Sequence, residues 1–415
     1  MLRVVVLALL VALAGCHRQA NAPSDAPTGL TVEEGDGRVT VRWDELPGLT
    51  YWIFFQAGSS VEARSPGVPL IFDAHSPRVV AGLANGIEYA FVMNATYQDS
   101  PGGPSTPVAT AVPRLAGATW TSGAPIGSPP QNLNGVVFGA ALSRIVAVGD
   151  AGTLLAGDLN YTSTSPPGVT AWTQATSVPT GFASDLSSVA TSGSQFIALG
   201  TDGSVVTNID GTAWTSPGGS IASGGARMNS LAFGLVASAA TYVAVGNGGN
   251  IFRSADLVTW NPAVSNTTSD LYNVSFPKDA FIATGANGTL LTSTDAVTWV
   301  SQSSNTSMAL RGSTYGTNPA GVSYYVVVGD AGTIVTSPDR TTWSVTPPPL
   351  SQDLRAIRLG TRFVAVGQGG AVVYSDDAIN WSVSSVPGSP DLASIIFTPS
   401  MYLAVGPAGA NAVSR

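Results

Sequence analysis

Residues 242–260 read YVAVGNGGNIFRSADLVTW, and this stretch decides the fold. A short apolar run ends at Gly246, Gly249 follows three residues later, and a second apolar run leads on to Trp260. Short apolar runs that are separated by glycine-rich turns are typical of antiparallel strands joined by hairpins. The stretch therefore predicts three consecutive β-strands.

The same pattern occurs seven times in the second part of the chain, and its period predicts a β-propeller. The first glycines of the Gly-x-x-Gly turns lie 38 to 51 residues apart, which is the length of a four-stranded propeller blade. In the second to sixth units a tryptophan follows this glycine after 14 residues; in the first unit the gap is 23, which indicates an insertion at about 156–170. The first glycines are Gly149, Gly200, Gly246, Gly285, Gly329, Gly367 and Gly406.

Each unit is preceded by a pattern such as DLYNVSF, which we interpret as the innermost strand of a blade. The last unit has no tryptophan, whereas Trp120 stands in a segment with no unit before it. Six complete units and two complementary pieces make seven. We therefore predict an all-β chain with a seven-bladed β-propeller over residues 117–415, closed by an N-terminal strand that leaves no long free edge. An open solenoid of the same repeats is the alternative.

Four units also share the spacing Ser-x-Asp-x-x-x-Trp, and Asn208 to Trp214 is a variant of it. This spacing resembles the Asp-box, or bacterial neuraminidase repeat, and the VAVGDAGTI-type runs are similar to the propellers of the photosystem II assembly and stability factor family. The resemblance implies that the aspartate accepts hydrogen bonds from turn amides and that the tryptophan packs between blades, away from any active site. Only Gly211 keeps the usual turn glycine, so we expect the other turns to differ in detail.

Residues 27–113 predict a separate β-sandwich. Runs that alternate apolar and polar residues flank the turn at Gly35 to Gly37. The segment resembles a fibronectin type III domain through Pro27, Trp43, and Leu83 placed six residues before Tyr89. The resemblance implies that Trp43 lies in the core and that Tyr89 forms a tyrosine corner, in which the phenol bonds nearby backbone. Another small β-sandwich is the alternative, and residues 17–26 are interpreted as a linker.

The first sixteen residues predict an export signal. Residues 4–14, VVVLALLVALA, form an apolar run of signal-peptide length that leads into Leu13-Ala14-Gly15-Cys16. This resembles the bacterial lipobox, in which the cysteine receives a lipid anchor. His17, rather than Asp, at the next position implies sorting to the outer membrane of the cell envelope. An incidental cysteine in an ordinary signal peptide is the alternative.

Charge and composition exclude several function classes. The net charge is −8 and no basic stripe occurs, so we predict no nucleic-acid partner. Residues 115–415 contain no Glu, His or Cys, which removes the Tyr/Glu pair of sialidases, a Ser-His-Asp triad and an ordinary zinc site. We therefore predict no catalytic residue, metal or cofactor, although a glycosidase built on two of the 15 Asp residues remains open.

One position on the innermost strands predicts a binding surface. Tyr272, Arg311 and Arg355 follow the first leucine of three consecutive strands, and Arg358 and Arg362 add positive charge nearby. Such an arc favours an acidic or carboxylate-bearing partner, and ordinary surface arginines are the alternative. The predicted function is an envelope-anchored interaction or assembly scaffold for a protein partner, and the alternative is a glycan-binding or sialidase-like propeller. In chain order the residues at this position are Asn134, Ser187, Asn229, Tyr272, Arg311, Arg355 and Ala393.

Overall fold

The computed structural model describes residues 21–97, 100, 102–160, 168–179, 184–317, 321–399 and 401–415. The chain divides into two compact units, the first up to Arg114 and the second from Leu115 onward. The described regular structure consists of strands and short 3-10 turns, and no helix among the described residues is long and apolar enough to cross a membrane. The predicted signal peptide with Cys16, and residues 17–20, lie outside the described residues.

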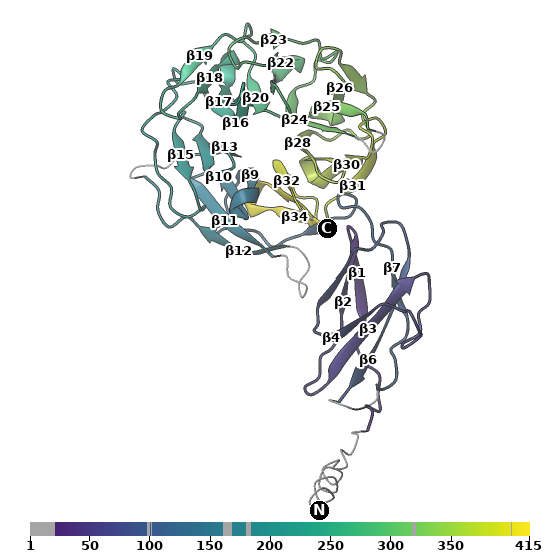
Figure 1. The fold of residues 1–415 in the computed structure, drawn as a ribbon. Coiled ribbons are helices and arrows are strands. Elements are labelled where there is room, and N and C mark those ends of the chain that lie inside the picture. The colour runs from purple at the N-terminus through teal and green to yellow at the C-terminus, as the bar shows by residue number, and fades with distance from the viewer. Residues whose placement is uncertain are drawn as a thin grey trace, which may run out of the picture. The chain divides into compact units, whose positions relative to one another are not determined.

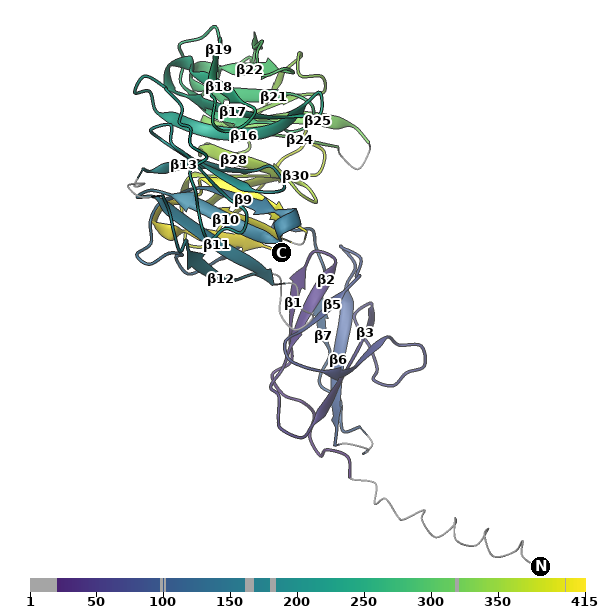
Figure 2. The same cartoon turned by 60° about the vertical axis from the view of Figure 1, so that its left-hand side comes forward.

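The first unit consists of two antiparallel sheets with a hydrophobic core (Figure 2). Trp43 is buried in this core, as predicted, and the Tyr89 hydroxyl oxygen accepts a hydrogen bond from the Ala84 N–H at 3.1 Å. The expected bond between the phenol and nearby backbone is therefore present. The strand orders are β1 (Thr31–Gly35), β2 (Arg38–Arg42), β5 (Arg78–Ala81) in one sheet, and β4 (Leu70–Ala74), β3 (Thr50–Ala57), β6 (Tyr89–Thr96), β7 (Ala109–Ala111) in the other.

The second unit is an all-β propeller, in which antiparallel sheets surround a central opening (Figure 1). Its described strands form seven sheets, numbered I to VII here, and the first strand of each lies nearest the centre. The sheets are I, β9 (Leu133–Gly139), β10 (Arg144–Gly149), β11 (Thr153–Asn160), β12 (Gly168–Gln174); II, β13 (Leu186–Thr191), β14 (Phe196–Gly200), β15 (Val205–Asn208); III, β16 (Met228–Val236), β17 (Ala239–Gly246), β18 (Ile251–Ser254), β19 (Asn261–Ala263); IV, β20 (Leu271–Ser275), β21 (Phe281–Gly285), β22 (Leu290–Ser293), β23 (Val300–Ser301); V, β24 (Leu310–Thr317), β25 (Ser323–Gly329), β26 (Ile334–Ser337), β27 (Ser344–Thr346); VI, β28 (Leu354–Leu359), β29 (Phe363–Gly367), β30 (Ala371–Ser375), β31 (Ser382–Ser385); and VII, β32 (Ser394–Thr398), β33 (Met401–Val405), β34 (Asn411–Ser414), β8 (Thr121–Ser122).

The last sheet combines the two ends of this unit. Strand β8 pairs with β34, so that Thr121 lies opposite Val413, and this is the pairing that the two complementary pieces of sequence predict. Trp120, directly before β8, is buried against Tyr402 with ring centroids 6.4 Å apart. The N-terminal segment therefore supplies both backbone hydrogen bonds and apolar packing to sheet VII.

The contact between sheets VII and I is built like the contacts between sheets that follow each other in the chain. The Ser188 Oγ of sheet II accepts a hydrogen bond from the Leu231 N–H of sheet III at 3.1 Å. The Ser394 Oγ of sheet VII accepts one from the Val136 N–H of sheet I at 3.3 Å. Strand β32 also contacts β9, as each innermost strand contacts the next. The same serine contact therefore joins the last sheet to the first.

Sheet II departs from the expected four strands. Three strands are present among its described residues, and the segment after Trp214 forms isolated bridges in place of a fourth strand: Thr215 with Thr207 of β15, and Ser220 with Ser204 just before β15. Pro217 lies between the two bridges and has no N–H to donate, so it interrupts the ladder. In sheet I the expected insertion lengthens the hairpin of β11 and β12, and its residues 161–167 lie outside the described residues.

The two glycines of each Gly-x-x-Gly turn have different roles, which the sequence alone does not separate. Gly332 has a φ of +69°, the left-handed conformation that favours glycine. Gly329 is extended at −164°, but a Cβ there would lie 2.0 Å from the Ala309 carbonyl oxygen. The second glycine is therefore needed for its positive φ, and the first is needed because two backbones approach closely there.

The outer hairpins contain the Asp-box residues, and they form the predicted contacts. The Asp295 Oδ1 accepts hydrogen bonds from the Val297 and Thr298 N–H groups at 2.8 and 2.7 Å, and Trp299 is buried. In the turns without glycine, the residue after the aspartate adopts the same left-handed conformation as Gly211, whose φ is 82°. These residues are Leu257, Ala296, Arg340 and Ala378, with φ between 61° and 71°.

Candidate functional site

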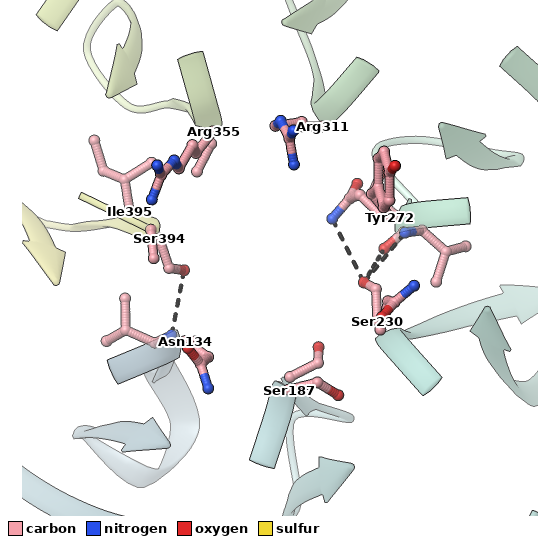
Figure 3. Close-up of a pocket in the computed structure, with 18 of the residues that line it drawn as sticks. Asn134, Ser187, Ser230, Tyr272, Arg311, Arg355, Ser394 and Ile395 are labelled. Atoms are coloured by element: carbon pink, nitrogen blue, oxygen red, sulfur yellow. Dashed lines mark hydrogen bonds between the residues drawn. The ribbon is translucent and has the colours of Figure 1, made fainter. Parts of the chain in front are cut away.

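The innermost strands surround a channel of about 350 Å³, which is the candidate binding site. All seven residues at the position singled out in the sequence line it, and Figure 3 shows five of them, among them Tyr272, Arg311 and Arg355. Arg358 also lines the channel. The structure therefore brings together the four residues that the sequence proposes as a binding surface. Arg362 is not among the lining residues.

A β-bulge at the start of the innermost strands directs this ring of side chains. In sheet V, Leu310 pairs with Gly329 and Gly312 pairs with Val328, so Arg311 is the extra residue between them. A bulge redirects the side chain of the extra residue and disrupts the ladder locally. The same register shift occurs in sheets I to IV and VI, where the extra residues are Asn134, Ser187, Asn229, Tyr272 and Arg355.

Arg311 is held in place by an acid and by an aromatic ring. Its guanidinium donates to both carboxylate oxygens of Asp330, with Nη2 at 3.0 Å from Oδ2, and it lies 5.0 Å from the centre of the Tyr272 ring. The hydrogen bond to Asp330 raises the pKa of Arg311 above its ordinary value. This cation therefore stays charged and is already paired.

The remaining arginines of the predicted arc differ in their pairing. The Arg355 Nη2 lies 3.5 Å from the Asp391 Oδ2, which belongs to the segment before β32 of the next sheet. Arg362 forms a bidentate ion pair with Asp376 at 2.8 and 2.9 Å and stacks on Tyr374. The prediction treats these arginines as available positive charge, and this needs correction, because acids that the sequence analysis did not single out neutralise Arg311, Arg355 and Arg362.

Arg358 is the exception. It comes from β28, three residues beyond Arg355, and no carboxylate of the described residues forms an ion pair with it. Its side chain is accessible to water inside the channel, yet protein surrounds it, and this desolvation lowers the pKa of its guanidinium. Arg358 therefore places an uncompensated positive charge inside the propeller.

Acids at the channel rim also join neighbouring sheets, and the sequence analysis missed them. The Asp353 Oδ1, before β28, accepts a hydrogen bond from the Ala331 N–H in the Gly-x-x-Gly turn of sheet V at 3.0 Å. Asp391 bonds the Gly369 N–H of sheet VI in the same way at 2.8 Å. The sequence does contain a feature that could have identified these acids: an aspartate stands directly before the first leucine of the pattern in four sheets. These residues are Asp185, Asp270, Asp353 and Asp391.

The channel lining combines uncharged side chains with positive charge. Its lining residues are neutral amides, hydroxyls and apolar groups together with Tyr272 and three arginines, and none is acidic. Among the described residues, no group of three or more His, Cys, Asp or Glu side chains is placed to hold a metal ion. Within the part of the chain that the structure describes, this lining offers hydrogen-bond donors, an aromatic face and one cation without an ion pair, Arg358.

No protein-family model matches this chain, and no curated protein matches it. Solved structures do match it. YCF48 bound to a D1 peptide is 17% identical with a TM-score of 0.54, over 71% of this chain and 96% of that chain. YCF48 from Cyanidioschyzon merolae is 16% identical with a TM-score of 0.51, over 71% and 98%. A catalytically inactive variant of virginiamycin B lyase from Staphylococcus aureus with quinupristin is 11% identical with a TM-score of 0.59, over 71% and 98%. These likenesses show that the chain contains a β-propeller.

Proposed function

We propose that this chain is a non-catalytic interaction or assembly scaffold, which binds a protein partner at the channel mouth of a seven-bladed propeller. The observation that carries the proposal is the ring of bulged residues, in which Asp330 holds Arg311 against the face of Tyr272. Tyrosine and arginine are enriched among the residues that dominate binding energy at protein interfaces. Because this pair is already ordered, binding costs little side-chain entropy.

The likeness to YCF48 supports a protein ligand. That protein has been solved with a D1 peptide, and it shares the propeller fold with this chain. At 17% identity the likeness carries the fold and not the ligand, so the kind of partner is taken from the analogy and its identity stays open.

The remaining parts of the chain suit an anchored scaffold. Cys16 is the proposed lipid-attachment site, which holds the protein to the cell envelope, at the outer membrane. The unit that contains Trp43 and Tyr89 is the proposed fibronectin type III domain, which acts as a spacer; its two antiparallel sheets support this proposal.

Two observations favour binding over catalysis. The lyase among the matching structures is inactivated by a histidine-to-alanine replacement, whereas residues 115–415 of this chain contain no histidine. The Asp-box aspartates are engaged by turn amides, as Asp295 shows, so they are poorly placed to act as a pair of catalytic carboxyls.

The tryptophans also argue against a glycan ligand. Four of them are buried, which leaves few aromatic faces on which a sugar ring could stack; they are Trp120, Trp214, Trp299 and Trp343.

Partner capture tests the proposal. The full tagged chain is solubilised from membranes and cross-linked, and its neighbours are identified by mass spectrometry. An Arg311→Ala/Arg355→Ala double variant removes two positive charges from the channel lining. An Arg227→Ala/Arg253→Ala variant removes two positive charges elsewhere and serves as the control. A discrete protein that is lost only in the first variant supports the proposal. Enrichment of polysaccharide without a protein partner overturns it in favour of the glycan-binding alternative.

A further inference from the structure

The charge on Arg358 is a feature of one sheet and not of the repeat. Counted from the first leucine of the innermost-strand pattern, Arg358 is the fifth residue in sheet VI. The fifth residues of the other patterns are small or apolar and uncharged, namely Val137, Ala190, Ala232, Ser275, Thr314 and Ile396. The other sheets of the propeller therefore form without a charge at this position. The fold of the repeat does not require the charge of Arg358.

Its charge has no counter-ion among the described residues of the channel. Arg311 and Arg355, the other cations of the channel lining, each lie against a carboxylate, whereas none of the described carboxylates pairs with Arg358. A charged group that protein surrounds is unfavourable unless it is paired and hydrogen-bonded. Guanidinium has five N–H donors in a planar fork, which an anion with two oxygens in one plane satisfies best.

We propose that the channel binds one carboxylate group on Arg358. The single uncompensated charge matches a monovalent anion better than a divalent phosphate. The channel volume of about 350 Å³ is enough for about ten waters, so a small acid fits with its hydration. The hydroxyls of Ser275 and Ser313 lie 2.6 Å apart and also line the channel. Since one donates to the other, the second keeps a proton for a ligand.

The carboxylate has two possible sources. A free small-molecule acid can enter the channel whether or not a protein binds at the mouth. An acidic side chain or chain end of a protein partner can also reach Arg358, and this source rests on the proposed function. The binding chemistry is the same in both cases, so it is tested first with a small probe.

Sodium acetate is titrated into the full, detergent-solubilised chain near neutral pH at constant ionic strength, with sodium chloride as balance. Calorimetry and the melting temperature are both recorded. We expect saturable binding and an acetate-dependent rise in melting temperature for the wild type, with weaker binding of inorganic phosphate. Arg358→Gln should weaken acetate binding at least about tenfold, because a charge-assisted bidentate contact is lost. Arg358→Lys should retain part of it, and the matched control Arg253→Gln should bind like the wild type.

Folding of the variant is checked without acetate. Arg358→Gln should melt at the same or a higher temperature than the wild type, because removal of an unpaired charge surrounded by protein is not destabilising. Equal acetate binding by wild type and Arg358→Gln overturns the proposal, as does an absence of saturable acetate binding to the wild type.

Partner capture with Arg358→Gln then separates the two sources. Loss of the captured protein assigns the carboxylate to the partner, whereas retention assigns the site to a free acid. If the wild type captures no protein at all, the proposed function fails while the acetate result still stands, so the two failures are distinguishable.

Discussion

The hydrogen bonds of the Asp-box turns should make the propeller sensitive to acid, and Asp295 provides the clearest test. Its carboxylate accepts hydrogen bonds from the Val297 N–H, the Thr298 N–H and the Ser293 hydroxyl, all between 2.7 and 3.0 Å. The bond from Thr298 is foremost in holding the pKa of Asp295 at about 2. Asp295→Ala removes all three acceptor contacts, while Asp295→Asn keeps an acceptor oxygen but cannot ionise.

The expected cost of Asp295→Ala is modest because the turn is exposed. Loss of a comparable side-chain cap on backbone N–H groups costs about 1 kcal/mol, and water and salt weaken the charge term further. For a propeller of this size that corresponds to about 2 °C in melting temperature. The folded pKa lies below the value of about 3.9 in an unfolded chain. The stabilisation is therefore fully present above about pH 4 and is lost as the pH falls through about 2.

Melting temperatures of the wild type, Asp295→Ala and Asp295→Asn are compared from neutral pH down to the lowest pH at which the wild type folds. We expect a gap between wild type and Asp295→Ala at neutral pH that narrows in acid, and a smaller gap for Asp295→Asn. Equal melting temperatures at neutral pH, or a gap that stays constant into acid, would refute the assignment of the stabilising contacts to an ionised Asp295.

Three further predictions follow from single contacts. Gly367→Ala should destabilise the propeller by more than about 2 kcal/mol, because the new Cβ would lie 1.8 Å from the Asp353 carbonyl oxygen. Gly369→Ala in the same turn has free space for its Cβ and should destabilise the propeller by about 1 kcal/mol. Similar denaturation midpoints for the two variants would contradict this difference. Trp120→Ala should destabilise the propeller by about 3 to 5 kcal/mol in chemical denaturation, since it empties a buried site beside β8, and a cost below about 1 kcal/mol would mean that the N-terminal segment is dispensable. Tyr89→Phe should destabilise the first unit by about 1 kcal/mol through loss of the acceptor for the Ala84 N–H, with no change in the melting of the propeller.

The repeat and its closure could be predicted from the sequence because both depend on local order along the chain. Glycine, tryptophan and apolar residues recur at fixed spacing, and side chains alternate along a strand, so the residues at one position of each repeat must face the same surroundings. This is why the sequence alone places Asn134, Tyr272, Arg311 and Arg355 on one surface, where the structure also has them. The pairing of Trp120's segment with the last sheet followed from the same argument.

The electrostatic character of the channel was decided by the tertiary structure. Arg355 is neutralised by Asp391, which precedes the innermost strand of the next sheet, and the rotation between adjacent sheets sets this contact, not spacing along one strand. The β-bulges decide which side chains turn into the channel, and composition does not reveal them. Arg358 stands three residues from Arg355 in the same strand but has no such neighbour among the described residues. From the sequence both arginines are positive charges on one strand, and the packing of sheets around the channel decides that Arg355 is paired and that Arg358 is not paired with any described carboxylate.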